Sequence, residues 1–168
     1  MKTFLRAFLK PFSFVPAICM MVIIYSFSGQ NGMESAGLSL KVSRFIVETA
    51  ARIFDHPLTP ERVLFHAESI HFVVRKLAHM GIYFLLAVSV SFPLYVYGLR
   101  GIRLMLVAGL FCVAFACTDE YHQSLVAGRG PSKRDVFIDS IGVFFGIIAV
   151  RIVGFIGRKT IFRPLSRR

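Results

Sequence analysis

The chain has 168 residues, of which 55% are hydrophobic and only 17% are charged, and its formal net charge is +11. A soluble domain carries about 25% charged residues, so this composition excludes an ordinary soluble domain and indicates a single membrane-embedded one. The surplus cations adjoin hydrophobic runs and form no aromatic-interleaved basic patch, so we expect membrane lipids and no nucleic acid as partners.

Hydrophobic runs long enough for a transmembrane helix, about 20 residues, occur at four places. They lie at about 12–28, 72–97, 102–118 and 136–157. We therefore predict an all-α, polytopic membrane protein with one domain, residues 1–168. The first run has no convincing small-residue cleavage site near its end, so we interpret it as a retained helix and not as a signal peptide.

The link between the first two runs has structure of its own. Apolar residues recur there at helical spacing, namely Leu38, Val42, Phe45, Ile46, Thr49 and Ile53. This pattern predicts an amphipathic helix over about 38–54, lying on the membrane surface or on the bundle. Thr59 and Pro60 then form a helix-start pattern, which predicts a second short helix leading into the second span.

Polar residues gather at one end of all four spans. They are Ser28 and Gln30 on the first, Arg75, Lys76 and His79 on the second, Asp119, Glu120, His122 and Gln123 on the third, and Asp135 and Asp139 on the fourth. A charge at membrane depth is costly unless it is paired or hydrated. We therefore expect Arg75 or Lys76 to pair with Asp119, Glu120 or Asp139, and the whole group to line one polar pocket.

The charges also predict an orientation. The N-terminal tail with Lys2, Arg6 and Lys10, the link with Arg100 and Arg103, and the C-terminal tail with Arg163, Arg167 and Arg168 are basic and contain no acid. All nine acids lie in the two other links, or at the ends of the spans that adjoin those links. By the positive-inside rule, we expect both termini in the cytoplasm and the polar pocket on the outer face.

The fourth run contains a packing motif. Asp135, Asp139, Gly142 and Gly146 fall on one line of a helix, and "GVFFG" is a small-xxx-small element that lets helices approach closely. The carboxylates on this line should therefore face the bundle and not the lipid. The three cysteines lie in apolar runs and indicate neither a disulfide framework nor a metal pair.

Several chemistries remain open for the polar group. His79 with Asp119 or Glu120 fits a general base and its orienting carboxylate. The His and acid spacing matches no standard ligand motif, so we expect no metal and no cofactor. A serine nucleophile on Ser28, Ser124 or Ser132 lacks a GxSxG elbow. In the "GRGPSKR" turn, Arg129, Lys133 and Arg134 fit an anionic head group, and a purely structural set of helix-locking pairs is the remaining alternative.

These same residues carry a family resemblance. "SFSGQ", "VRKLAHMGIYFLLAV" and "DEYHQSLVAGRGPSKRDVFIDSIGVFFG" contain, in order, R-K-x-x-H, D-E-x-x-Q, and an Arg followed by D-x-x-x-D-x-x-G. From about Ser26 to Gly146 the chain resembles the VanZ-like family of small bacterial membrane proteins. The resemblance implies polar site positions at Ser28, Gln30, Arg75, Lys76, His79, Asp119, Glu120, Gln123, Arg129 and Asp135. Asp139 departs from the Asn that many relatives have there.

The resemblance also implies a setting. The namesake of the family is associated with low-level resistance to teicoplanin, a lipid-tailed glycopeptide, which places a VanZ-like protein in the bacterial cell envelope and cytoplasmic membrane. We expect Arg75, Lys76 and Arg129 to bind a lipid-linked or lipoglycopeptide ligand. Alternatives are an acid–base enzyme, a hydrolase or transferase with His79 or Glu120 as general base, and a structural scaffold or partner subunit. The sequence leaves these alternatives and the oligomeric state open.

Overall fold

The computed structural model of the protein describes residues 10–130 and 132–159. Its elements are a 3-10 turn, η1 (Pro11–Phe14), and the helices α2 (Val15–Ser28), α3 (Gly32–Ile53), α4 (Pro60–Val96), α5 (Gly101–Ser124) and α6 (Lys133–Lys159). The described residues contain no strand, so the all-α prediction is confirmed. The tail cations Lys2, Arg6, Arg163, Arg167 and Arg168 lie outside the described residues.

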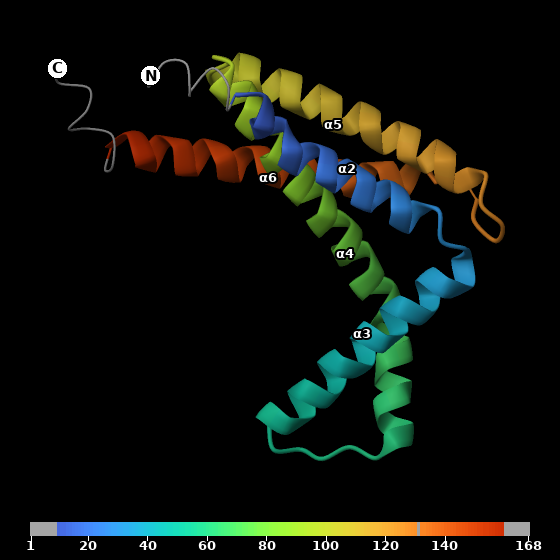
Figure 1. Cartoon of the computed structure of the whole chain (residues 1–168). Coiled ribbons are helices and arrows are strands. Elements are labelled where there is room, and N and C mark those ends of the chain that lie inside the picture. Colours follow the sequence, from blue (N-terminus) through green and yellow to red (C-terminus); the bar gives the residue numbers. More distant parts are fainter. Residues whose placement is uncertain (1–9, 131, 160–168) are drawn as a thin grey trace.

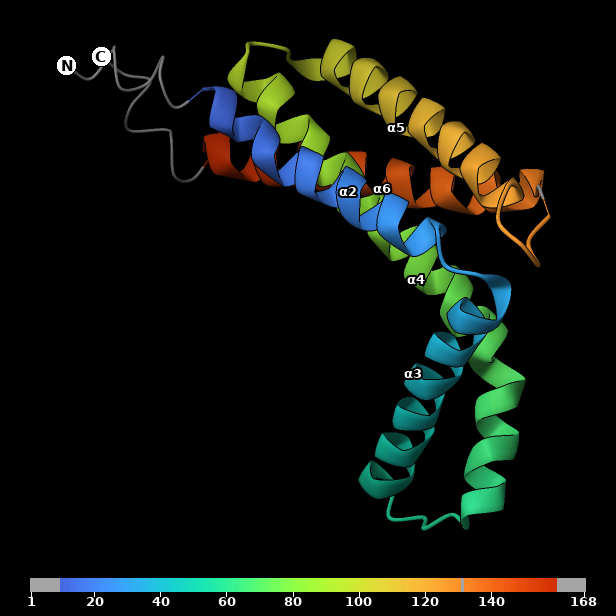
Figure 2. The same ribbon diagram turned by 45° about the vertical axis from the view of Figure 1, so that its right-hand side comes forward.

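Four helical segments are long and apolar enough to cross a membrane: Pro11–Ser28, Pro60–Val96, Gly101–Ser124 and Lys133–Gly154. The predicted polytopic membrane fold is confirmed at this level. In Figures 1 and 2, α2, α5, α6 and the C-terminal part of α4 run side by side as a bundle. We call the end where α2 begins and α6 ends the terminal end, and the opposite end, where α2 and α5 end and α6 begins, the loop end.

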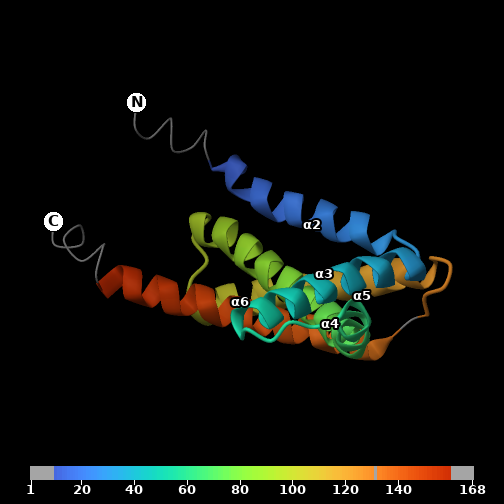
Figure 3. The same cartoon turned by 90° about the horizontal axis from the view of Figure 1, so that it is seen from below.

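Helix α4 is too long to serve as a simple span. Its 37 residues correspond to about 55 Å at 1.5 Å per residue, whereas the hydrocarbon core is about 30 Å thick. The C-terminal part lies in the bundle, and the N-terminal part turns sideways, so that Figure 3 shows it end-on beside α3. The expected separate short helix is thus continuous with the second span, because no Gly or Pro interrupts residues 61–80.

Helix α3 starts at Gly32, earlier than the apolar stripe indicated. The reason is a capping box: Asn31 Oδ1 accepts a hydrogen bond from Glu34 N at 2.8 Å, and Glu34 Oε2 accepts one from Asn31 N at 3.2 Å. Helix α3 then packs on the N-terminal part of α4, with Ser43 and Ala67 fully buried. The two helices form a hairpin that projects from the loop end of the bundle (Figures 1 and 2).

The tightest contact in the bundle joins α4 to α6. A Cβ atom on Gly142 would lie 2.1 Å from the backbone oxygen of Met80, and one on Gly146 would lie 2.5 Å from that of Phe84. Both glycines are buried. The predicted small-xxx-small contact is confirmed, and it fixes α6 against the helix that carries Arg75, Lys76 and His79.

Candidate functional site

The polar residues at the end of the third span lie at the loop end, because α5 continues to Ser124. This is past the expected end near residue 118, and it places Asp119, Glu120 and Gln123 on the last turns of the helix. All three side chains are buried. The turn that follows brings Arg129 back toward α2, and α6 then begins with Asp135 in its first turn.

A cleft of about 670 Å³ opens at this end between the start of α3, the middle of α4 and the α5–α6 turn. This volume falls within the range of small-molecule sites, about 300–1,000 Å³. We call it the polar cleft. It is lined by Asn31, Gly32, Met33, Ala36, Phe72, Arg75, Lys76, Glu120, Gln123, Ala127, Gly128, Arg129, Gly130 and Asp135.

A second, smaller hollow of about 180 Å³ lies next to it between α2, α3 and α4. Most of its lining is apolar, and we call it the apolar groove. It is lined by Ile24, Phe27, Ser28, Gln30, Ser35, Leu38, Ser39, Val42, Val74, Arg75, Ala78, His79, Ile82, Tyr83, Asp119 and Arg129. Arg75 and Arg129 line both the cleft and the groove, so they mark the junction between them.

Asp119 is held inside the bundle by neutral partners. Its Oδ2 accepts hydrogen bonds from Tyr83 OH and from Gln123 Nε2, each at 3.0 Å. Gln123 Nε2 also donates to Ser28 Oγ at 3.3 Å. These contacts join α2, α4 and α5. Asp119 Oδ1 is buried and has no hydrogen-bond partner among the described residues.

Glu120 and Asp135 have structural partners of their own. Glu120 Oε1 accepts a 2.6 Å hydrogen bond from Ser132 N, which ties α5 to the turn before α6. Asp135 forms an ion pair with Lys76. We expected Arg75 or Lys76 to pair with Asp119, Glu120 or Asp139, and this prediction is wrong, because Lys76 pairs with Asp135 and Arg75 with none of the three among the described residues. Asp135 is one turn earlier on α6 than Asp139 and less buried, so the long lysine side chain reaches it near the surface.

Asp139 lies deeper, on the face of α6 that meets α4. It is 3% exposed, and its Oδ1 is 3.9 Å from Nδ1 of His79. This distance is too long for a hydrogen bond. Asp139 Oδ1 therefore has no hydrogen-bond partner within the described part of the chain. His79 faces Asp139, and not the orienting carboxylates Asp119 or Glu120 that the sequence indicated.

Arg75 and Arg129, which lie at the junction, have N–H groups without hydrogen-bond partners among the described residues. Arg129 donates from one guanidinium nitrogen to Ser28 O at 3.3 Å, while its buried Nε has no partner among the described residues. Burial lowers the pKa of Arg129, as does the neighbouring Arg75, but a guanidinium stays protonated in proteins. Arg75 is partly buried and forms no ion pair or hydrogen bond within residues 10–130 and 132–159.

The structure brings together nearly all of the residues singled out in the sequence. Of the predicted group, all but two line the polar cleft or the apolar groove. The exceptions are Asp139, buried behind His79, and His122, whose ring stacks on Tyr25 with centroids 4.3 Å apart. Lys133 and Arg134 are exposed and line neither hollow.

Two contacts were not predicted from the sequence. Tyr83 continues the helix line of Arg75 and His79 in the sequence, but its hydrogen bond to Asp119 was not expected. Asn31 lines the polar cleft from the start of α3, and the signal was the Asn-x-x-Glu capping pattern.

Among the described residues, no three His, Cys, Asp or Glu side chains lie close enough to hold an ion together. The site holds three buried carboxylates, those of Asp119, Glu120 and Asp139, beside His79 and the cations.

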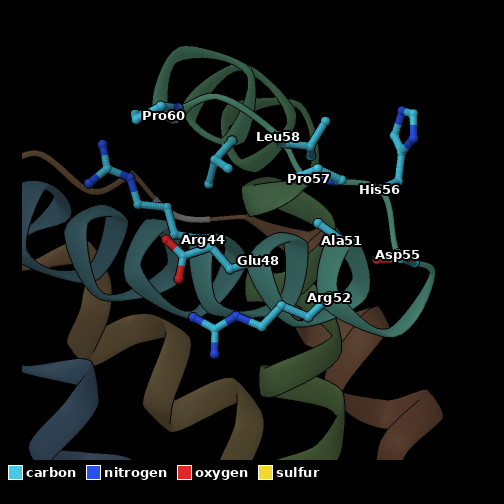
Figure 4. Close-up of a pocket in the computed structure, with 10 residues that line it drawn as sticks. Arg44, Glu48, Ala51, Arg52, Asp55, His56, Pro57, Leu58 and Pro60 are labelled. Atoms are coloured by element: carbon cyan, nitrogen blue, oxygen red, sulfur yellow. The ribbon is translucent and has the colours of Figure 1, made fainter.

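A separate cleft of about 680 Å³ lies at the far tip of the hairpin, between α3 and the segment that leads into α4. Figure 4 shows Arg44, Glu48 and Arg52 along α3, with Pro57 and Leu58 in the segment that leads into α4. Its charged side chains are exposed. This tip cleft shares no lining residue with the polar cleft or the apolar groove.

Comparison with known proteins assigns a family. A family model described as VanZ/LLP1 matches residues 13–154. This range includes every residue of the polar cleft and the apolar groove. Neither a curated protein nor a solved structure matches the chain significantly.

Proposed function

The chain belongs to the VanZ/LLP1 family, and we propose that it is a bacterial cell-envelope protein that binds the anionic head group of an amphiphile in the polar cleft. The ligand class comprises lipid-linked envelope molecules and lipoglycopeptides. Binding a lipid-tailed glycopeptide or its lipid-linked target would link this member to teicoplanin-type resistance.

The observation that carries this proposal is the junction of cleft and groove. Arg75 and Arg129 both lie there, and both have donors without partners among the described residues. An unsatisfied donor in a partly buried site is costly. Guanidinium groups bind phosphate and carboxylate through paired hydrogen bonds. An anion with an attached hydrocarbon chain would accept hydrogen bonds from the two arginines and place its chain in the apolar groove.

The polar cleft also has a charge balance suited to such a head group. Three cations line it, namely Arg75, Lys76 and Arg129, against the carboxylates Glu120 and Asp135. The cations that line the cleft outnumber its lining carboxylates by one, which favours a negative group. Gln123 and Asn31 add neutral hydrogen-bonding groups that would suit hydroxyls or amides next to the anion.

The charges of the chain support an outward-facing site. Lys10, Arg100 and Arg103 lie at the terminal end of the bundle. All nine acids belong to the hairpin or the loop end. By the positive-inside rule, the terminal end would face the cytoplasm and the polar cleft would open toward the envelope side of the membrane.

The proposal is tested by binding to the purified protein in nanodiscs. Phosphatidic acid and teicoplanin represent the two sources of an anionic amphiphile, and phosphatidylcholine serves as the reference lipid. We expect wild-type protein to prefer at least one anionic probe over the reference. Arg75→Ala should weaken that binding by about tenfold or more, because a charge-assisted hydrogen bond contributes about 1.5–3 kcal/mol.

Arg62→Ala is the matched control. Arg62 lies on the same helix as Arg75, is exposed and lines neither hollow. Equal binding of all three probes by the wild type, or equal losses for Arg75→Ala and Arg62→Ala, would overturn the proposal.

A second function is favoured by a separate observation, the pair that half-buried His79 forms with buried Asp139. His79 and Asp139 face each other at 3.9 Å, and His79 also lines the apolar groove. A histidine beside a buried carboxylate fits a general base, so a hydrolase or transferase acting on a lipid-linked substrate is the alternative. A His79→Gln variant that folds normally and keeps full cellular activity would eliminate it.

A further inference from the structure

Helix α3 has three distinct faces. One face, with Ser39 and Ser43, is buried in the hairpin. A second carries the exposed charges Lys41, Arg44, Glu48 and Arg52. The third is an apolar stripe that remains exposed, with Phe45 at 70% and Ile53 at 73%. A hairpin in water would bury its large apolar stripe, but α3 buries its small residues and leaves the stripe uncovered.

The position of the hairpin relative to the bundle explains this choice. It turns sideways from the loop end, so α3 runs at a steep angle to the membrane-spanning helices (Figures 1 and 2). If the bundle crosses the bilayer, a sideways helix at its end lies near the lipid interface. An amphipathic helix with a charged face and an apolar face is stable there, with the apolar side among the acyl chains.

The apolar stripe of α3 is continuous with the apolar groove. Leu38 and Val42 belong to the stripe and also line the groove. Phe27 of α2 and Ala78 of α4 form other parts of the groove wall, and both are exposed. The groove is thus open on the side where lipid would surround the bundle. Its inner end is polar, with Arg75 and Arg129.

We propose that the groove is a subsite for a hydrocarbon chain, which reaches it sideways from the surrounding leaflet along α3. The anionic group of the same molecule then lies at Arg75 and Arg129. This inference rests on the proposed function and adds the chemical class of the ligand: an anionic lipid with a long chain. The groove's 180 Å³ holds about six groups the size of a water molecule, so only the part of the chain nearest the head group is enclosed.

A groove-blocking variant tests the subsite. Ala78→Trp fills the groove, and Ala114→Trp, on the exposed face of α5, is the matched control. Each variant is measured against long-chain phosphatidic acid and water-soluble dihexanoyl phosphatidic acid. We expect Ala78→Trp to weaken long-chain binding by about tenfold, since two buried methylene groups contribute about that factor. Binding of the short-chain probe should stay at the wild-type level.

The outcomes separate this inference from the proposed function. If wild-type protein binds neither probe, the chain subsite for an anionic lipid is overturned, and if it also shows no preference for teicoplanin over the reference lipid, the proposed function fails. If wild type binds both probes and Ala78→Trp loses no long-chain affinity, the head-group site stands and the chain subsite is overturned. Equal losses for Ala78→Trp and Ala114→Trp would also overturn the subsite.

Fluorescence tests the path along α3. The chain contains no tryptophan, so a single introduced tryptophan reports its surroundings without background. In nanodiscs with lipids brominated on their acyl chains, Phe45→Trp on the stripe should be strongly quenched, and Arg44→Trp on the charged face should be quenched much less. Equal quenching of the two variants would show that the stripe does not lie among acyl chains and would overturn the sideways path.

Discussion

The contact between α4 and α6 has two halves, one formed by glycines and the other by charged side chains. Toward the middle of the bundle, Gly142 and Gly146 let α6 lie directly on the backbone of α4. At the loop end, one and two turns earlier on the same face, Asp139 and Asp135 meet His79 and Lys76. The close contact leaves no room for a ligand, whereas the charged half lies beside a cleft. One pair of helices thus provides both a rigid joint and a site.

This comparison predicts that the glycine half determines stability and the charged half determines binding. Substitutions in the glycine half should be the most destabilising because the neighbouring atoms are backbone and cannot move aside. Substitutions toward the cleft should cost progressively less stability as side chains become more exposed and their partners fewer.

The largest effect is expected from Gly142→Ala. The new Cβ would lie 2.1 Å from Met80 O, so the two helices must separate. Overpacking of this kind costs about 1–3 kcal/mol and occasionally more. Thermal unfolding in detergent, followed by circular dichroism, should show a clearly lower Tm. Gly154→Ala on the same helix has nothing within 4 Å of its new Cβ and should leave Tm unchanged; equal shifts would refute the close contact.

The next largest effect is expected from Asp119→Ala. This change leaves Tyr83 OH and Gln123 Nε2 without their buried acceptor. An unsatisfied buried polar group costs about 1–3 kcal/mol, and the same unfolding measurement reports it. In the Tyr83→Phe background, one orphaned donor is absent, so Asp119→Ala should then cost less. An unchanged cost would contradict the hydrogen bond between the two residues.

The Lys76–Asp135 ion pair should have a smaller effect, because both side chains are partly exposed. A double-mutant cycle with Lys76→Ala and Asp135→Ala should give a coupling free energy near the lower end of the usual range, about 0.5–3 kcal/mol. The charge-swapped pair Lys76→Asp with Asp135→Lys should recover part of the loss. Additive single effects would show that the pair does not contribute.

Sequence patterns predicted the fold well where one physical rule dominated. Hydrophobic length predicted the four spans, and helical spacing predicted the Gly142 and Gly146 contact. The polar residues of the four spans also meet at one end of the bundle, as their positions in the sequence indicated. These features follow from the cost of exposing polar groups to lipid and from helix periodicity, both of which can be read locally.

Pairing within the site could not be predicted in the same way. Four carboxylates and three cations converge at the loop end, and their partners depend on side-chain reach and on helix rotation. Thus Lys76 meets Asp135, and Asp119 takes neutral partners. The sideways turn of α4 was also missed, because a continuous helical sequence does not specify where the helix leaves the membrane.

The smallest stability effect and the largest binding effect should coincide at Arg75. Without an ion pair or hydrogen bond in the described part of the chain, Arg75→Ala should change the free energy of unfolding by no more than about 0.5 kcal/mol. Measured on the same preparation in nanodiscs, its affinity for the preferred anionic amphiphile should fall by about tenfold or more. Wild-type affinity combined with a clearly lower Tm would contradict the account and make Arg75 a structural residue.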